Sequence, residues 1–427
     1  MMIDRYTENI SNFVRQRKTA KGRKLINKIN DVTLREIHKN MPPKKATGVD
    51  EINKQQYSKD LDKNIRSLVN RIKDNSYYPK PIKRIYIHKF GDQMRPIGII
   101  CYEDKLVSSN IEKLLSAIYE PSFKKFSYGF RPNKNCHSAI RRIIKVIKTQ
   151  PVDYTVEADI KSFFDTLDHD LLMNFLKFHI DDESFLQLIK RFLKNGVFEK
   201  GRYQSGERGI PQGNVMSPIL ANIYLHYVLD LWFEEYVKKY CTGKAFIVRY
   251  ADDFVCMFQF KFEAESFLKA LIIRLKKFNL DVAPSKTKLL RFGKKVYREW
   301  RKTGLNKPEP FSFLGFTLYC SYHLNEFFVL INTNRAVFLE KLKNFKEWIR
   351  RNNNLSVNEI IKKVNCLLIG HYNYYGANAN MHIVRSFKNE IEKILVSELK
   401  IRKMEKHLIS KIRKNLYSIP SRAHFYV

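Results

Sequence analysis

Three aspartates are the residues of this chain whose types and positions point most directly to chemistry. Asp252 and Asp253 stand side by side between two apolar runs, Phe246 to Tyr250 and Phe254 to Phe258, a pattern that predicts a β-hairpin. Ala251 and Asp252 make a poor two-residue turn by intrinsic preference, and adjacent carboxylates repel each other. We therefore expect a functional reason for two charges at the tip of this hairpin.

The third aspartate, Asp159, ends another predicted strand. In the stretch VDYTVEADI, apolar residues from Val152 to Ile160 alternate with polar ones, which is typical of a half-buried strand. Carboxylates are ionised at neutral pH, and Mg²⁺ prefers a few such oxygens together with water and phosphate oxygens. Two Mg²⁺ ions about 4 Å apart can activate a hydroxyl and stabilise a leaving pyrophosphate. Asp159, Asp252 and Asp253 therefore predict a nest for hard cations at two strand ends, which could do this chemistry.

A second adjacent pair, Asp181 and Asp182 in FHIDDESF, serves as a comparison. This pair opens a predicted helix, where acids suit the positive end of the helix dipole. It has an ordinary structural explanation. Asp252 and Asp253 have none, because negative charge between two apolar strands is costly unless something compensates it.

The composition indicates a globular protein with an anionic partner. The 427 residues are too many for one ordinary domain, and 44% hydrophobic with 28% charged residues is typical of a globular chain. A net charge of +35 favours a polyanion, with nucleic acid as the first candidate. An anionic membrane surface is the alternative, but the basic residues are spread along the whole chain. No apolar run approaches bilayer length and the N-terminus has no signal core, so we expect a cytoplasmic protein with no membrane partner.

The six cysteines lie far apart and have no C-x-x-C spacing. This spacing argues against a zinc module and against a disulfide framework. We expect all six to be small, buried apolar residues.

Three regions follow one another along the chain. Residues 1–47 carry twelve Lys or Arg and four acids and predict a basic helical extension, for which a plain solvated helix face is the alternative. Pro42, Pro43 and Gly48 then break the helix. Residues 48–330 mix strand-like and helical stretches and predict an α/β body. Its strands are expected at 82–88, 152–160, 246–250, 254–258 and 311–319.

The last region, residues 331–427, predicts a separate basic domain that is helical from residue 335 onward. Residues 335–427 hold nineteen Lys or Arg and seven acids, an excess that a nucleic-acid backbone would neutralise. Ser356 and Glu359 form a predicted capping box at the start of one helix. The aromatic residues near the end of that helix either stack on RNA bases or pack against the body: His371, Tyr372, Tyr374 and Tyr375.

Eight segments and a final helical one resemble a single family in their order along the chain. They are KATGVDEINKQQY, YYPKPIKRIYIHKFGDQMRPIGI, SYGFRPNKNCHSAI, VEADIKSFFDTLDHDLL, GIPQGNVMSPILANIYLHYVLDLWFE, VRYADDFV, LDVAPSKTKLL, FSFLGFTL and LIGHYNYYG. The sequence resembles the bacterial group II intron-encoded reverse transcriptases, also called maturases. The resemblance implies an α+β right-hand polymerase, with fingers and palm over residues 48–330, and an α-helical thumb or maturase domain that binds RNA over residues 331–427.

The resemblance also implies roles for individual residues. Asp159, Ile160, Asp252 and Asp253 would hold two Mg²⁺ ions, with Mn²⁺ as an alternative ion, and the three aspartates would be catalytic. Phe164, five residues after Asp159, would exclude a ribose 2′-hydroxyl and so select deoxynucleotides. A phenylalanine of the core is the plainer alternative for Phe164.

Five polar residues would contact the nucleotide or the metal site. Lys89 and Arg95 would grip the triphosphate, because their donors suit phosphate oxygens; two cations on a solvated hairpin are the alternative. Gln212 would line the nucleotide pocket. Lys286 would offset the crowded charge of the aspartates, and Arg131 would contact template or nucleotide.

Three positions depart from the family pattern. Asn214 stands where the family usually has a second glycine after Gly213, and we expect it to add a polar side chain beside the nucleotide. Ser162 replaces a common glycine, and His88 replaces a frequent proline. None of these changes removes a metal ligand, so activity should survive.

The leading hypothesis is an RNA-directed DNA polymerase that also binds its intron RNA, assists splicing and takes part in intron mobility. The expected partners are an RNA template, a DNA primer or target and deoxynucleoside triphosphates; a homodimer is left open. Because no His/Cys-rich nuclease block follows the thumb segment, we expect no intrinsic DNA cleavage. One alternative is a domesticated reverse transcriptase acting with a noncoding RNA in phage defence or DNA repair. Another is a splicing factor without catalysis, although intact clustered carboxylates argue against it.

Overall fold

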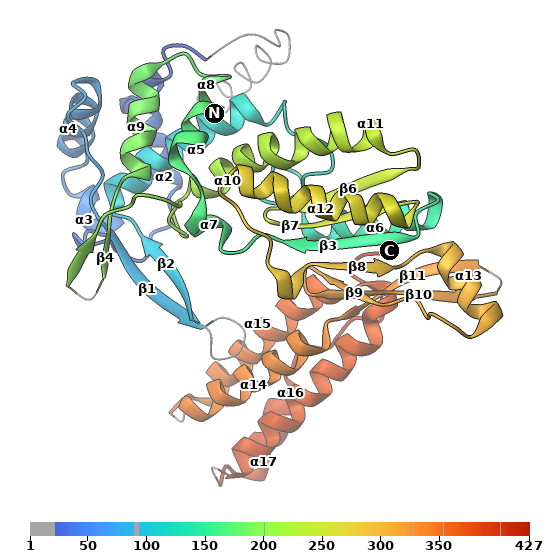
Figure 1. Cartoon of the computed structure of the whole chain (residues 1–427). Coiled ribbons are helices and arrows are strands. Elements are labelled where there is room, and N and C mark those ends of the chain that lie inside the picture. The colour runs from blue at the N-terminus through green and yellow to red at the C-terminus, as the bar shows by residue number, and fades with distance from the viewer. Residues whose placement is uncertain (1–21, 89–93, 200, 325, 353, 402) are drawn as a thin grey trace.

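The computed structural model describes residues 22–88, 94–199, 201–324, 326–352, 354–401 and 403–427. Figure 1 shows a central sheet with helices packed against it, a smaller first sheet with helices on the left, and a group of C-terminal helices that projects downward from a third sheet. Within the described ranges, no helix has both the length and the apolar character that crossing a membrane requires.

The central sheet is antiparallel and has the strand order β6-β7-β3-β8. Alternate residues of its strand β7 face two different hydrophobic cores, with Phe254 and Cys256 in one and Val255 and Met257 in the other. Both faces are therefore covered, which fixes the register of the strands. The strands are β3 (Tyr154–Asp159), β6 (Ala245–Tyr250), β7 (Asp253–Phe258) and β8 (Lys288–Arg291).

Helices of the central body share these two cores with the sheet. Those in the first core are α5 (Tyr102–Tyr119), α8 (His169–Lys177), α9 (Glu183–Leu193), α10 (Ser217–Leu225) and α12 (Lys261–Lys277). The second core contains α6 (Cys136–Thr149) and the third sheet. Helix α10 continues through wider π-helical turns at His226–Asp230 and Phe233–Val237 into α11 (Lys238–Tyr240), and α13 (Lys294–Thr303) follows β8.

The predicted hairpin is confirmed. Strands β6 and β7 pair with Tyr250 opposite Asp253, so Ala251 and Asp252 form its two-residue turn. Ala251 has a φ of 57°, the left-handed conformation that tight hairpin turns need and that residues other than glycine adopt at a cost. The aspartates thus follow directly on a strained backbone position.

The first sheet has the strand order β2-β1-β4-β5. Its strands are β1 (Ile82–His88), which matches the predicted range, β2 (Met94–Ile99), β4 (Val197–Glu199) and β5 (Arg202–Gln204). The N-terminal helices are α2 (Asp31–Asn40), α3 (Lys54–Ser58) and α4 (Leu61–Lys73). One face of α2 is buried in the first core through Leu34 and Ile37. Residues 1–21 of the predicted extension lie outside the described residues.

The third sheet, β11-β10-β9, corrects the prediction of one strand at 311–319. Leu314 and Gly315 turn the chain there with φ values of 50° and 76°. The apolar pattern continues across this turn, so alternation alone did not reveal it. The strands are β9 (Phe311–Phe313), β10 (Phe316–His323) and β11 (Glu326–Thr333), and β11 runs past the predicted boundary at residue 330.

The C-terminal helices have a core of their own, which includes Phe345, Leu368 and Phe387. The predicted capping box is confirmed, because Ser356 caps α15 and Glu359 returns the hydrogen bond. The helices are α14 (Arg335–Arg351), α15 (Val357–Tyr375), α16 (Met381–Ile401) and α17 (Lys406–Lys414).

The aromatic residues at the end of α15 pack inside the protein. His371 stacks on Phe387 with 3.8 Å between ring centroids, and burial lowers the pKa of His371 to about 3. The hydroxyls of Tyr372 and Tyr374 donate to backbone carbonyls, and Tyr375 is buried. The packing alternative is therefore the better description of these rings.

The cysteine prediction is correct in part. All six cysteines are free, and Cys101 and Cys256 are buried. Cys366 is exposed on α15, contrary to the prediction, and the other three are intermediate. A basic helix surface tolerates one small exposed side chain without an apolar partner, so the residue type alone did not decide its burial.

Candidate active site

Two of the three predicted catalytic aspartates face each other across neighbouring strands. Asp159, the last residue of β3, pairs in register with Asp253, the first residue of β7. Directly opposite residues have Cβ atoms about 4.5–5.5 Å apart and side chains on one face of the sheet. Asp252 precedes Asp253 in the hairpin turn. The fold therefore brings all three aspartates to one end of the central sheet.

Negative charge at this place is poorly compensated. Burial, followed by the charges of Asp159, Asp252 and Glu157, raises the pKa of Asp253 to about 8. Burial is also the main reason that the pKa of Asp252 is raised, and the Asp159 charge adds to it. A cation bound here would remove much of this penalty, because it favours the ionised carboxylates.

Lys286 lies against the aspartates, where the sequence placed it. Its Nζ is 2.5 Å from Asp159 Oδ2, and this hydrogen bond raises the pKa of Lys286. The side chain comes from a short turn, Pro284–Lys286, which a 2.8 Å hydrogen bond from Ala283 N to Asp159 O fixes to β3. More than half of the Lys286 side chain is exposed, so little packing holds it on Asp159.

A cavity of about 390 Å³ lies beside Asp159 and Asp253, with β9 as part of its wall. Glu157, on the same face of β3, also lines it, and burial raises the pKa of Glu157 to about 7. Across the described parts of the chain, no three His, Cys, Asp or Glu side chains are grouped so that they could already hold a metal ion. Lys286 occupies Asp159 Oδ2 in this arrangement.

The structure gives little direct evidence on two further predicted site residues, Ile160 and Lys89. The Ile160 side chain is buried and has no ligand atom, so only its backbone oxygen could bind a metal ion. Lys89 lies outside the described residues. Both roles stay predictions.

Arg95 and Gln212, two of the predicted nucleotide contacts, touch each other. Arg95 Nε donates to Gln212 Oε1 over 2.7 Å, which joins β2 to the segment before α10. The backbones are joined as well, by a 2.5 Å hydrogen bond from Gly98 N to Gln212 O. The Arg95 charge offsets part of the burial that raises the pKa of Asp252, so Arg95 lies within electrostatic reach of the aspartates.

The residues after Gln212 are set by close packing. Gly213 has a φ of 113°, and a Cβ there would lie 2.3 Å from Gly98 O, so only glycine fits. Asn214 corrects our expectation of a polar group beside the nucleotide. It is 3% exposed, and its Oδ1 accepts a hydrogen bond from Met216 N over 3.2 Å. Its side chain supports the entry to α10 instead.

Phe164 lies in the short helix α7 (Phe163–Thr166), directly after Ser162, which has a left-handed φ of 47°. The Phe164 ring is partly buried against the first core. Its carbonyl accepts a 2.6 Å hydrogen bond from Ile210 N, so Phe164 and the segment that carries Gln212 are fixed to each other. This placement agrees with a residue beside the nucleotide pocket, and its steric role stays a prediction.

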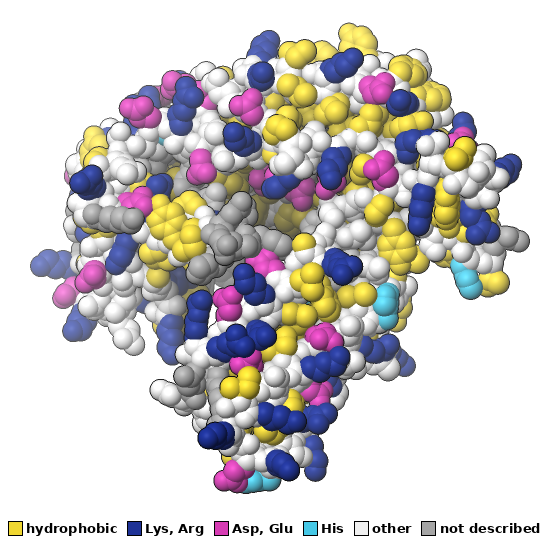
Figure 2. All heavy atoms as spheres, turned by 60° about the horizontal axis from the view of Figure 1, so that its bottom comes forward, with side chains coloured by type: hydrophobic (Ala, Val, Ile, Leu, Met, Phe, Trp, Pro, Cys, Tyr) yellow, Lys and Arg dark blue, Asp and Glu magenta, His cyan; other side chains and the backbone are white. Residues whose placement is uncertain are grey.

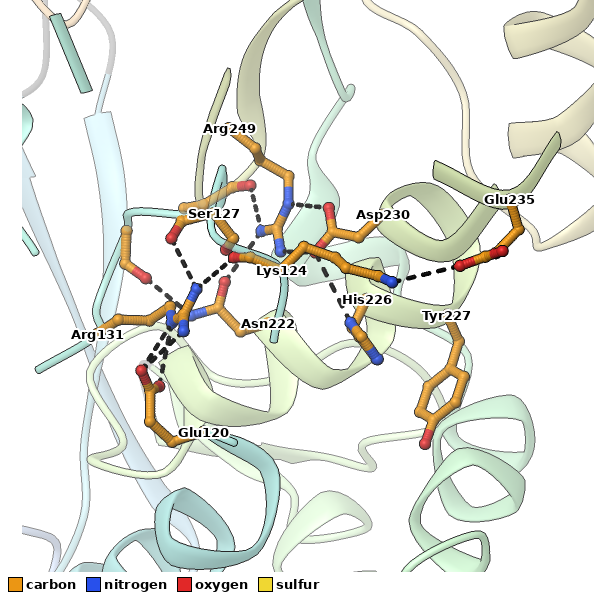
Figure 3. Close-up of polar contacts among 12 residues, drawn as sticks. Glu120, Lys124, Ser127, Arg131, Asn222, His226, Tyr227, Asp230, Glu235 and Arg249 are labelled. Atoms are coloured by element: carbon orange, nitrogen blue, oxygen red, sulfur yellow. Dashed lines mark hydrogen bonds and ion pairs between the residues drawn. The ribbon is translucent and has the colours of Figure 1, made fainter. Parts of the chain in front are cut away.

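Arg131 has contacts of a different kind from those predicted. Figure 3 shows its guanidinium turned toward Glu120 and toward carbonyls of its own loop. Arg131 Nη2 lies 2.7 Å from Glu120 Oε1, Nε also donates to Glu120, and Nη1 donates to the carbonyls of Lys124 and Ser127. All three guanidinium nitrogens are engaged, and only 5% of the side chain is exposed. These contacts favour a structural role over contact with template or nucleotide.

A buried polar cluster that was not predicted from the sequence lies beneath the hairpin. It consists of Arg249 on β6, Asn222 on α10 and Asp230 in the π-helical turn that follows α10 (Figure 3). The signal was available, because each of these residues is a single polar position inside an apolar run.

The surface view agrees with a nucleic-acid partner. Figure 2 shows a hollow at the centre of one face with acidic side chains beside it. Lys and Arg side chains are spread over the C-terminal helices below this hollow, mixed with a smaller number of acids.

Comparison with known proteins decides the family. Residues 87–318 match the family described as reverse transcriptase (RNA-dependent DNA polymerase). The chain belongs to the reverse transcriptase family. The matched range contains the three aspartates and the predicted nucleotide contacts, and the family implies a polymerase fold with palm and fingers.

Relatives of this reverse transcriptase include intron-encoded proteins. The group II intron-encoded protein LtrA of Lactococcus lactis is 41% identical over 172 residues, which are 39% of this chain and 28% of LtrA. Protein YkfC of Escherichia coli is 34% identical over 206 residues, 46% of this chain and 52% of YkfC. A 91 kDa protein in the cob intron of Schizosaccharomyces pombe is 41% identical over 170 residues, 40% of this chain and 21% of that protein. The predicted relationship to group II intron-encoded proteins is confirmed, and the alignments span about half or less of each relative.

Proposed function

We propose that this reverse transcriptase copies RNA into DNA by two-metal nucleotidyl transfer. The observation that carries the proposal is the pairing of Asp159 with Asp253 across two palm strands, with Asp252 in the adjoining turn. Like charges directly opposite each other destabilise a sheet. A binding site for cations gives this arrangement a use that a purely structural protein would not have.

The palm carboxylates fit Mg²⁺ by the chemistry of their oxygen donors. Asp159, Asp252 and Asp253 would hold the ions, with the backbone oxygen of Ile160 as a further ligand and Mn²⁺ as an alternative ion. Bound ions would supply activation of the primer hydroxyl and stabilisation of the leaving pyrophosphate. Lys286 supports the proposal, because its ammonium already balances one carboxylate in the free protein.

The neighbouring residues would select and orient the incoming deoxynucleotide. Arg95 offers guanidinium donors to phosphate oxygens, and its hydrogen bond to Gln212 aligns the two side chains. Phe164 would place a ring against the sugar, where it leaves no room for a 2′-hydroxyl. Gly213 packs against the Gly98 carbonyl, and because it has no side chain, its backbone would let a base pair approach closely.

The C-terminal helices would serve as the thumb and as an RNA-binding surface. Their excess of cations suits a phosphate backbone, and two of the relatives are named for introns. We therefore propose that the chain binds a structured intron RNA, assists its splicing and contributes to intron mobility.

Primer extension tests the catalytic part of the proposal. Purified protein with an RNA template, a DNA primer, Mg²⁺ and deoxynucleotides should lengthen the primer, and Asp252→Asn or Asp253→Asn should abolish this without unfolding the chain. Asp181→Asn is the matched control, because it neutralises the exposed member of the other adjacent-aspartate pair. Full extension by the double Asp252→Asn, Asp253→Asn variant would refute the site. Splicing assistance without any extension by wild-type protein would instead identify a splicing factor.

A further inference from the structure

A buried arginine lies directly beneath the catalytic turn. The Arg249 and Asp230 side chains are both 0% exposed. Arg249 Nε lies 2.7 Å from Asp230 Oδ1 and Nη2 lies 2.5 Å from Oδ2, so the guanidinium and the carboxylate form a bidentate ion pair. The remaining nitrogen, Nη1, donates to Asn222 Oδ1 and to the carbonyl of Ala251, each over 3.0 Å. Figure 3 shows the Arg249 guanidinium turned toward Asp230 and Asn222.

The contact to Ala251 reaches the one residue of the turn whose backbone is strained. Ala251 has a left-handed φ and immediately precedes the two aspartates. A strained residue keeps its conformation only when its surroundings determine it. The Arg249 hydrogen bond to its carbonyl is a fixed, charge-assisted contact that does this from inside the protein.

The same cluster ties the turn to the loop before α6. Asn222 Nδ2 donates to Gly129 O over 2.8 Å, and Gly129 lies so close to the turn that a Cβ there would meet Ala251 N at 2.4 Å. The Arg249 backbone also pairs with this loop, because Arg249 N donates to Phe126 O and Arg249 O accepts from Tyr128 N. The turn is thus held from the helix side and from the loop side together.

The position of Asp230 points to geometry rather than stability. It ends a π-helical turn, His226–Asp230, and such wide turns occur often at functional sites. His226 Nδ1 lies 4.0 Å from Asp230 Oδ2, but burial lowers the pKa of His226 to about 4, so Arg249 is the cation that balances this carboxylate. A buried ion pair can often be replaced by apolar residues without loss of stability. Stability alone therefore does not account for a buried ion pair at this place.

We infer that Arg249, held by Asp230 and Asn222, is a positioning residue that sets the Ala251 turn so that Asp252 and Asp253 can share metal ions with Asp159. The inference rests on the proposed polymerase function for its kinetic consequence, whereas its structural consequence concerns the turn alone. Arg249 touches neither substrate nor metal in this scheme and acts through the Ala251 carbonyl.

The decisive variant replaces the ion pair by apolar residues, Arg249→Met together with Asp230→Leu. It should still fold but unfold at a denaturant concentration somewhat below wild type, because the ion pair itself is replaceable whereas Asn222 Oδ1 and the Ala251 carbonyl lose their donor. Amide hydrogen exchange at the hairpin tip should be at least about tenfold faster, because a charged hydrogen bond has been lost, while the rest of β6 and β7 is unchanged. Primer extension should have a kcat about 10²-fold lower, the scale expected for a displaced catalytic group, and should need more Mg²⁺ for half its maximal rate.

Two further variants separate positioning from general packing. Arg71→Met with Glu103→Leu removes a partly buried pair of the fingers and should leave exchange at the hairpin tip and the Mg²⁺ requirement at wild-type levels. Arg249→Lys keeps the charge but loses the bidentate guanidinium geometry. It should therefore fall between wild type and the double variant in hydrogen exchange at the hairpin tip and in the Mg²⁺ requirement. It also decides the question if the double variant does not fold.

The inference is overturned if the folded double variant, or Arg249→Lys in its place, shows wild-type exchange at the turn and a wild-type Mg²⁺ requirement. If wild-type protein extends no primer at all, the proposed function fails, and the exchange measurement still decides whether Arg249 positions the turn.

Discussion

Replacing Asp253 by asparagine should stabilise the metal-free protein while it abolishes primer extension. Burial and the neighbouring carboxylates raise the pKa of Asp253 to about 8, compared with about 3.9 in an unfolded chain. The folded state favours the protonated carboxyl. The contribution of Asp253 to folding stability is therefore fully present below its pKa in the unfolded chain and is lost as the pH rises through its folded pKa of about 8. At pH 7 the carboxyl is ionised in the unfolded chain but mostly protonated in the folded one, and this difference destabilises the wild-type protein by up to about 4 kcal/mol. We expect asparagine to recover about 2–4 kcal/mol, since the side chain is partly exposed and solvent screens it.

Urea unfolding in the presence of a chelator, detected by a protease that cleaves the unfolded chain, measures this effect. The advantage of Asp253→Asn should grow from near zero at about pH 4 to its full size near about pH 8. Asp281→Asn, at an exposed site, should change stability little at any pH. Added Mg²⁺ should stabilise wild type and not the variant, because only the wild-type site binds it. A variant that is less stable than wild type in chelator, or a difference independent of pH, would refute the reasoning.

Three other outcomes can be measured on the same preparation. Phe164→Ala should raise ribonucleotide incorporation relative to deoxynucleotide in single-turnover extension, whereas Phe178→Ala, an exposed ring, should not; unchanged discrimination would place the sugar gate elsewhere. Gly213→Ala should abolish extension and lower stability, because its Cβ would lie 2.3 Å from the Gly98 carbonyl, while Gly370→Ala, which meets no atom within 4 Å, should be tolerated; an active Gly213→Ala protein would contradict this packing. Affinity for structured RNA in filter binding should fall by about 0.7–0.9 log units per phosphate contact for each tenfold rise in salt, and a flat response would argue against a phosphate-binding surface.

Local sequence patterns predicted the elements that carry the aspartates. The alternation before Asp159 predicts one strand and the two apolar runs around Asp252 and Asp253 predict two more, and all three strands are present. The comparison pair behaves as expected too, because Asp182 caps α9 by accepting a hydrogen bond from Phe185 N. These features depend on neighbours in sequence, which a pattern can show.

Contacts between distant segments were not predictable in the same way. Arg131 finds its carboxylate partner in Glu120, and Arg249 finds Asp230 and Asn222 on a helix, although nothing in the local sequence indicates which partner a cation will take. Asn214 was misjudged for a related reason, since its burial depends on how the chain enters α10. Net charge, by contrast, is a property of the whole chain, and the nucleic-acid partner that it indicated agrees with the reverse transcriptase family.

The close contact of Gly213 with the Gly98 backbone restricts how this protein can be changed by evolution or by design. Gly213 offers no route for gradual variation, because its Cβ would lie 2.3 Å from the Gly98 carbonyl and would demand a shift of that main chain, whereas a Cβ at Gly98 would meet the Ile82 side chain. In a saturation library, the Gly213 codon should therefore remain glycine among surviving clones. Engineers who want broader substrate acceptance would have to vary the side chains around this junction and leave the junction itself alone.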